Sequence, residues 1–222
     1  MKHPISIYFD AGIKPHPNGG FAQCFGWLAK DHQGQIIKEG KSVEVRSDDC
    51  GSCSVEFDAL ILALKGINEL NLHHEPITIH GDSRAVIDMC NGLGKAHSQT
   101  LCAKQQAVAS LSANFTSLNF VWIPRELNTQ ADKLGRMAFN ESTEQATRIT
   151  LMNKIYQLAK RYFGDLYSNK VLTAWYFSIA QKKRLAQMTT AELKHLHGCV
   201  SSIPKFIKKN ATLFAGHDQV AA

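Results

Sequence analysis

The chain has 222 residues, of which 44% are hydrophobic and 20% are charged, the composition of an ordinary globular protein. No apolar run approaches the roughly 20 residues that a transmembrane helix requires, so the sequence argues against a membrane protein. The N-terminus has no apolar secretory core, and the scattered cysteines predict reduced thiols, so we expect a cytoplasmic protein, or a nuclear one in a eukaryote.

The positive charge is concentrated in the last third of the chain. Residues 141–222 contain 12 Lys and Arg against 5 Asp and Glu, a net charge of +7, whereas residues 1–140 contain 13 against 14. This asymmetry predicts two domains, 1–142 and 143–222, of which the second is basic. A basic domain is expected to contact a polyanion such as nucleic acid, although lysines on a solvated helix face would give the same count.

Hydrophobic periodicity predicts alternating strands and helices in the first domain. Strands are expected at residues 5–10, 21–30 and 35–45, where β-formers are bounded by turn residues. Apolar positions at three- and four-residue intervals predict a helix over 54–70 with Ser54 as its N-cap. Two more strands and three more helices follow: strands at 77–82 and 118–123, and helices at 83–90, 103–111 and 128–139.

This order of elements predicts an α/β fold with a mixed five-stranded sheet. The first three strands are expected to pair as an antiparallel meander, and the fourth and fifth to lie parallel to the first, with helices on the faces. Ligands of such sheets gather at the carboxyl ends of the parallel strands. Asp10 and Asp82 are predicted to lie at those ends.

Four acidic residues are brought toward one edge of this sheet: Asp10, Glu56, Asp82 and Asp132. Each alone is explained as a turn or helix-start residue, and Glu56 is expected in the first turn of its helix, where the dipole favours an acid. Carboxylates about 5 Å apart repel by roughly 3 kcal/mol per pair, so the cluster requires cations or protons. Oxygen ligands favour two Mg²⁺ ions, or Mn²⁺, a pair that serves phosphoryl transfer.

Four motifs follow one another along the first domain: YFD at 8–10 with NGG at 18–20, VEFDAL at 55–60, HGDS at 80–83, and WIPRELNTQADKL at 122–134. Together they resemble the type 1 ribonucleases H over about residues 4–140, and the short last loop is similar to the plant and archaeal branch. The resemblance implies hydrolysis of the RNA strand of RNA·DNA hybrids, which leaves a 3′-hydroxyl and a 5′-phosphate. It also implies that Asp10 bridges both ions, that Asp132 completes one site, and that Glu56 and Asp82 complete the other.

The same resemblance implies substrate contacts in the loop of residues 12–20 and in the segment 50–54. Backbone and small polar groups there would read successive 2′-hydroxyls of the RNA strand. The substrate-binding residues implied by the resemblance are Gly12, Asn18, Gly19, Cys53, Ser54, Arg125 and Asn128.

Three departures from the family pattern leave two other functions open. A histidine that many relatives carry before the last helix is absent, which leaves Arg125 or Glu126 to replace it. Cys53 stands where relatives commonly have an amide, and the basic protrusion is missing or reduced around Lys95. The alternatives are a weak or inactive adaptor that binds nucleic acid with the same fold, and a nuclease of this fold that cuts another nucleic acid.

The basic last third is predicted to be helical. A helix over 148–163 is indicated by an apolar stripe that contains Ile149, Met152, Ile155, Ala159 and Tyr162. Thr189 and Glu192 have the spacing of a capping box, and residues 203–209 predict another helix, so the region is read as a helix-turn-helix or a small bundle. Residues 175–177, Trp-Tyr-Phe, are expected in its core, although aromatics among lysines also stack on bases.

Overall fold

The computed structural model describes residues 4–47 and 51–210, apart from the side chain of Asp165. Cys50, at the start of the expected substrate segment 50–54, lies outside the described residues. The chain divides into two compact units, Met1–Thr143 and Glu144–Ala222.

The division between the units falls inside one helix, α4 (Thr129–Phe163), which has 35 residues. The prediction of two separate helices at 128–139 and 148–163 is therefore wrong. Residues 140–147 contain neither glycine nor proline, so nothing in the sequence interrupts the helical hydrogen bonds between the two predicted segments.

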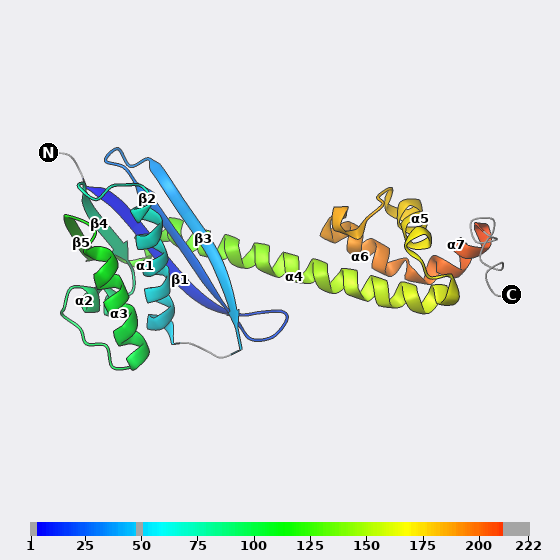
Figure 1. Ribbon diagram of the computed structural model, residues 1–222, viewed down its shortest axis with the longest axis horizontal. Coiled ribbons are helices and arrows are strands. Elements are labelled where there is room, and N and C mark those ends of the chain that lie inside the picture. The colour runs from blue at the N-terminus through cyan, green and yellow to red at the C-terminus, as the bar shows by residue number, and fades with distance from the viewer. Residues whose placement is uncertain (1–3, 48–50, 211–222) are drawn as a thin grey trace. The chain divides into compact units, whose positions relative to one another are not determined.

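The first unit is built on a mixed five-stranded sheet of order β3-β2-β1-β4-β5 (Figure 1). An antiparallel meander consists of β1 (Ile5–Pro15), β2 (Phe21–Lys30) and β3 (Ile36–Arg46). Parallel to β1 lies β4 (Pro76–Gly81), and parallel to β4 lies β5 (Ser117–Trp122). The predicted fold class is confirmed.

One strand is longer than predicted, and this changes the place of the first acid. β1 continues past Asp10 to Pro15, because residues 11–15 keep pairing with β2. Asp10 therefore lies inside its own strand. The parallel pairing of β1 with β4 ends earlier, at Tyr8 and His80, so Asp10 still lies next to the carboxyl end of β4.

Helices cover both faces of this sheet. On one face, α1 (Ser52–Asn68), α2 (Arg84–Cys90) and α3 (Gln99–Ser112) share a core with the sheet, and Figure 1 shows them on its near side. On the other face, Ala131 and Leu134 of α4 pack on Leu28. Gly26 permits this contact, since a Cβ there would lie 2.1 Å from the Ala131 carbonyl oxygen.

The start of α1 differs from the prediction. The helix begins at Ser52, with Gly51 as an N-cap residue that has no side-chain capping bond, so Ser54 is not the N-cap. Because the helix starts earlier, its first turn contains no acid and Glu56 lies in the second turn. The dipole explanation of Glu56 is correspondingly weaker, since that effect is confined to the first turn.

The second unit is all helical. Its core is formed by α4 with α5 (Asn169–Ala180), α6 (Thr190–Gly198) and α7 (Ile203–Lys209), joined by the 3₁₀ turns η2 (Gly164–Leu166), η3 (Leu185–Gln187) and η4 (Val200–Ser202). The capping box of Thr189 and Glu192 is confirmed. Trp175 and Tyr176 are buried as predicted, but Phe177 is 45% exposed.

A membrane-spanning helix was also sought among the described residues. None of their helices combines the length and the apolar character needed to cross a bilayer.

Candidate metal centre and active site

Three carboxylates from separate segments of the first unit converge. Asp10 comes from β1, Glu56 from α1 and Asp82 from the residue that follows β4. One ligand atom from each lies within 4.8 Å of the others. The parallel pairing of β1 and β4 explains the approach of the two aspartates, and the packing of α1 on β1 brings in the glutamate.

The cluster is electrostatically costly without a cation. Burial, together with the charges of Asp82 and Asp132, raises the pKa of Asp10 to about 7. Burial, together with the charges of Asp10 and Asp82, raises the pKa of Glu56 to about 9. In each case the Arg125 guanidinium acts in the opposite direction and lowers the pKa. The protein therefore gathers more negative charge at this place than its own cation neutralises.

The donor set fits a hard divalent cation. All three groups offer carboxylate oxygens, which are the ligands that Mg²⁺ and Mn²⁺ prefer. Glu56 Oε2 is buried and has no hydrogen-bond partner, and a buried acceptor of this kind is costly unless something satisfies it. Asp10, Glu56 and Asp82 are thus the residues that could hold a metal ion.

The fourth predicted acid, Asp132, lies close to this cluster without being part of it. It is in the first turn of α4, and its carboxylate pairs with the Arg136 guanidinium one turn later. Its charge nevertheless contributes to the raised pKa of Asp10. Asp132 and Asp10 line one hollow of about 240 Å³, whereas Asp10, Glu56 and Asp82 line another of about 500 Å³. The two hollows share Gly12 and Arg125 besides Asp10.

Asn128, expected among the substrate contacts, is 1% exposed. Its side-chain nitrogen donates to the Phe9 carbonyl oxygen at 2.8 Å and to Asp82 Oδ1 at 3.3 Å. The amide thus links β1 to one of the clustered carboxylates from inside the protein. Its position follows from η1 (Arg125–Leu127), the short turn that ends at Asn128 just before α4.

The other residues predicted to contact substrate fall into three places. Gly12 and Arg125 line the hollows beside the carboxylates. Asn18 and Gly19 are exposed in the turn between β1 and β2. Cys53 and Ser54 line a separate hollow of about 410 Å³ with Ser98 and other residues, and Lys104 Nζ donates to Ser54 Oγ at 2.7 Å.

Sequence reasoning missed three side chains at this site. Ser52 and Ser83 line the hollow of the three carboxylates, and Arg136 pairs with Asp132. The serines gave no signal beyond their neighbourhood to Glu56 and Asp82. Arg136 follows Asp132 at the four-residue spacing of helical ion pairs, and this pattern could have been read from the sequence.

Comparison with known proteins places this site in a family. Residues 17–138 match the family described as "Reverse transcriptase-like". The bifunctional protein Rv2228c of Mycobacterium tuberculosis and the uncharacterized protein Mb2253c of Mycobacterium bovis are each 25% identical over 142 residues, which is 64% of this chain. The match spans only 37% of the length of those curated relatives.

Solved structures extend the comparison. The N-terminal RNase H domain of Rv2228c from Mycobacterium tuberculosis has a TM-score of 0.55 and 23% identity, and covers 64% of this chain and 97% of that one. RNase H1 of the archaeon Halobacterium salinarum NRC-1 has a TM-score of 0.54 and 26% identity, covering 62% and 98%. LC11-RNase H1, solved in complex with an RNA/DNA hybrid, has a TM-score of 0.56 and 25% identity, covering 62% and 98%.

These similarities confirm the resemblance inferred from the motifs. The family match covers more than half of the chain, and the structural neighbours share the order of strands and helices described above. The chain therefore belongs to the reverse transcriptase-like family, and its first unit is a ribonuclease H-like domain.

Proposed function

We propose that this protein is a metal-dependent endoribonuclease that hydrolyses the RNA strand of RNA·DNA hybrids and leaves a 3′-hydroxyl and a 5′-phosphate. The observation that carries the proposal is the convergence of Asp10, Glu56 and Asp82 within 4.8 Å in a ribonuclease H-like domain. The neighbour LC11-RNase H1 was solved with an RNA/DNA hybrid, which supports hybrids as the substrate.

We assign the ion-binding roles from the two adjoining hollows. Asp10 lines both hollows, which supports a role shared between two divalent ions, Mg²⁺ or Mn²⁺. Glu56 and Asp82 would hold the ion in the larger hollow, and Asp132 would contribute to the ion in the smaller one. Two such ions, when bound, activate the attacking water and stabilise the leaving oxygen of the phosphodiester.

The chain's own residues would position the substrate and the carboxylates. Gly12 presents backbone without a side chain at both hollows, which suits close contact with a sugar hydroxyl. Arg125, exposed beside the cluster, would contact the scissile phosphate, whose charge it matches. Asn128 would hold Asp82 in place, and Asn18, Gly19, Cys53 and Ser54 remain proposed contacts with the nucleotides on either side.

We also propose a division of labour between residues 1–142 as the catalytic domain and residues 143–222 as a basic domain that binds nucleic acid. The support is the distribution of charge, +7 over residues 141–222. Nonspecific contacts of Lys and Arg with phosphates would add affinity that the weakly basic first unit does not supply.

Cleavage of labelled substrates tests the proposed reaction. RNA·DNA hybrid, duplex RNA and duplex DNA are incubated with and without Mg²⁺, and the products are sized and their ends identified. We expect hybrid to be cut only with the metal and Asp10→Asn to abolish the activity. Glu39→Gln, at an exposed acid of β3, is the matched control and should cut normally. Binding of hybrid without cleavage would support an adaptor instead, and cleavage of another duplex would identify a different nuclease.

A further inference from the structure

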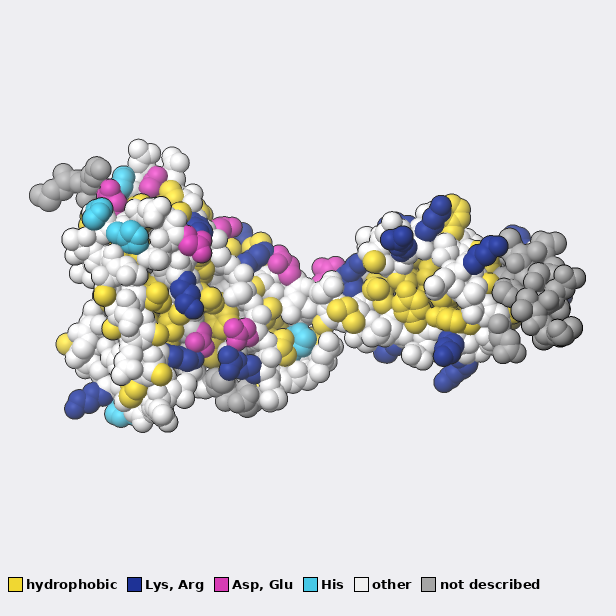
Figure 2. All heavy atoms as spheres, in the orientation of Figure 1, with side chains coloured by type: hydrophobic (Ala, Val, Ile, Leu, Met, Phe, Trp, Pro, Cys, Tyr) yellow, Lys and Arg dark blue, Asp and Glu magenta, His cyan; other side chains and the backbone are white. Residues whose placement is uncertain are grey.

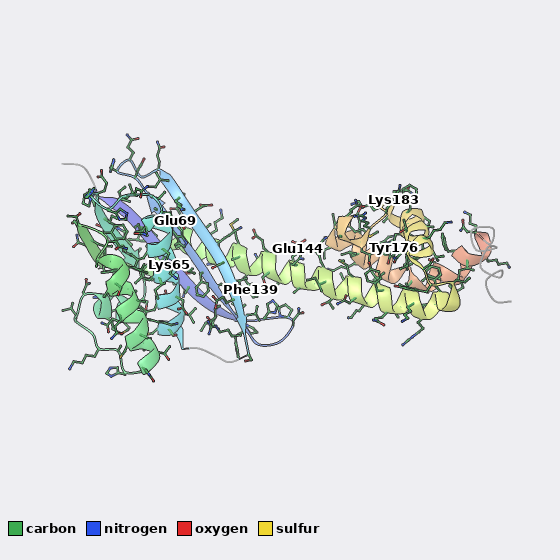
Figure 3. All side chains as sticks on the ribbon, viewed as in Figure 1. Lys65, Glu69, Phe139, Glu144, Tyr176 and Lys183 are labelled. Carbon is green, nitrogen blue, oxygen red and sulfur yellow. The ribbon has the colours of Figure 1, made fainter. Side chains whose placement is uncertain are left out.

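The second unit contains a hollow that the proposed reaction does not use. It measures about 550 Å³ and is lined by Phe177, Gln181, Lys182, Lys183, Arg184 and Gln187. These residues come from the end of α5 and from the segment that connects it to α6. Figure 3 labels Lys183 on this segment and Tyr176 on the neighbouring turn of α5.

Phe177 is the unusual member of this set. The two residues before it, Trp175 and Tyr176, are buried in the core of the second unit, whereas Phe177 is 45% exposed. An exposed aromatic ring on a protein surface is costly, and contiguous apolar exposure often marks a binding site. The ring is flanked by cations and by two glutamines, a setting that differs from the edge of a hydrophobic core.

The connecting segment is held in place by its own contacts. Leu185 and Met188 are buried, and the Arg148 guanidinium donates to the backbone carbonyls of Ala186 and Met188. Lys182 Nζ lies 2.7 Å from Glu192 Oε2, inside the capping box of α6. A segment fixed in this way presents its side chains with little loss of freedom on binding.

Two of the cations are available to a ligand. Lys182 is paired with Glu192, but among the described side chains neither Lys183 nor Arg184 forms an ion pair. Both are exposed, and Figure 2 shows Lys and Arg side chains on several sides of the second unit. The hollow therefore combines an exposed ring, two free cations, and amides that can donate and accept hydrogen bonds.

From this combination we propose that the hollow binds single-stranded nucleic acid, with a base stacked on Phe177 and the adjoining phosphates contacted by Lys183 and Arg184. An acidic peptide would match the cations equally well, but it would give no use to the ring and the two amides. Every base has a face that stacks on an aromatic ring, and base edges match the amides of Gln181 and Gln187. This inference deepens the nucleic-acid role proposed for residues 143–222 and rests on it.

The test measures binding of a labelled oligothymidine to the full-length protein in EDTA, beside an abasic phosphodiester of the same length. Phe177→Ala should weaken oligothymidine binding about tenfold, leave binding of the abasic strand unchanged, and leave the salt dependence of both unchanged. Phe177→Trp should retain the affinity, and unaltered thermal unfolding of each variant would exclude misfolding.

The cations have a separate signature. Lys183→Gln with Arg184→Gln should weaken both strands equally and lower the slope of log affinity against log salt by about 1.4, or about 0.7 per phosphate contact. The matched control, Lys170→Gln with Lys194→Gln, removes the same charge at exposed positions outside the hollow and should retain the slope.

Three results would overturn the proposal: equal loss on both strands with Phe177→Ala, an equal fall in slope with the control pair, or a polyglutamate peptide that binds as tightly and responds equally to Phe177→Ala. The outcome is independent of catalysis, since the probes are DNA and the metal is chelated. A protein that fails to cleave hybrids can still pass this test, and one that cleaves them can fail it.

Discussion

The side-chain amide of Asn128 donates to Asp82 Oδ1 at 3.3 Å, although 46 positions separate the two residues in the chain. The same nitrogen donates to the Phe9 carbonyl oxygen at 2.8 Å, in the residue before Asp10. One buried amide thus fixes the distance between the strand that carries Asp10 and the carboxylate that follows β4. The geometry of the carboxylate cluster depends on a residue that is itself hidden from substrate.

Asn128→Ala tests this positioning role. It leaves the Phe9 carbonyl oxygen without this partner, so the free energy of unfolding should fall by about 1–3 kcal/mol. Asp82 loses its orientation, so kcat for hybrid cleavage should fall at least about tenfold while KM changes little. Asn91→Ala is the control, because its amide donates to the Phe120 carbonyl oxygen at 3.1 Å from an exposed position. A raised KM with unchanged kcat would instead indicate that Asn128 contacts the substrate.

The carboxylate cluster also predicts how stability depends on pH. Burial, with neighbouring negative charges, raises the pKa of Asp10 to about 7 and that of Glu56 to about 9. Both groups ionise near pH 4 in the unfolded chain, so the metal-free fold is most stable below that pH and loses stability as the pH rises through about 7 and about 9. Thermal unfolding in EDTA measures the trend.

Asp10→Asn separates the cluster from the rest of the molecule. The difference in melting temperature between Asp10→Asn and the parent should grow in favour of the variant from about pH 5 to about pH 9. Added Mg²⁺ should reduce that difference by stabilising the parent, since a ligand that binds only the folded state raises its stability. Glu39→Gln should follow the parent at every pH. A difference that stays constant with pH would contradict the raised pKa values.

Much of the fold and part of the site could be predicted because they depend on local patterns and on topology. Alternating and helical periodicities identified the strands and helices, and parallel pairing of two strands that carry acids predicted the meeting of Asp10 and Asp82. Their approach to Glu56 followed from the helix that covers the same strands. These relations hold whatever the details of individual side chains.

The remaining features depend on interactions between distant residues. Nothing near Pro15 shows that β1 continues to it, since pairing with β2 extends the strand. Burial of Asn128 requires the close packing of α4 on β2 at Gly26, which no periodicity reports. Asp132 was expected beside the other acids, but Arg136 competes for it one turn away. Which partner prevails depends on metal ions that the sequence does not specify.

The Asp132–Arg136 pair predicts an effect on metal affinity. Arg136→Gln frees the Asp132 carboxylate to bind an ion, so the Mg²⁺ concentration that gives half-maximal cleavage should fall by about two- to fivefold, the range expected for an exposed ion pair. Arg136→Lys keeps a cation at the same place and should leave the Mg²⁺ requirement close to that of the parent. Activity titrated with Mg²⁺ on a saturating hybrid distinguishes the two variants. A higher requirement in Arg136→Gln would show that Arg136 assists metal or substrate binding.

The basic residues of α7 predict the salt dependence of hybrid binding. Lys205, Lys208 and Lys209 are exposed on this short helix. If they contact phosphates, replacing all three with Gln should weaken hybrid binding in EDTA and lower the slope of log affinity against log salt by up to about 3. Replacing all three with Arg keeps the charge and should preserve the slope. Anisotropy at several salt concentrations measures both. An unchanged slope in the Gln variant would place the phosphate contacts of residues 143–222 elsewhere or remove them, because counterion release follows the number of phosphates neutralised and not the total charge of the protein.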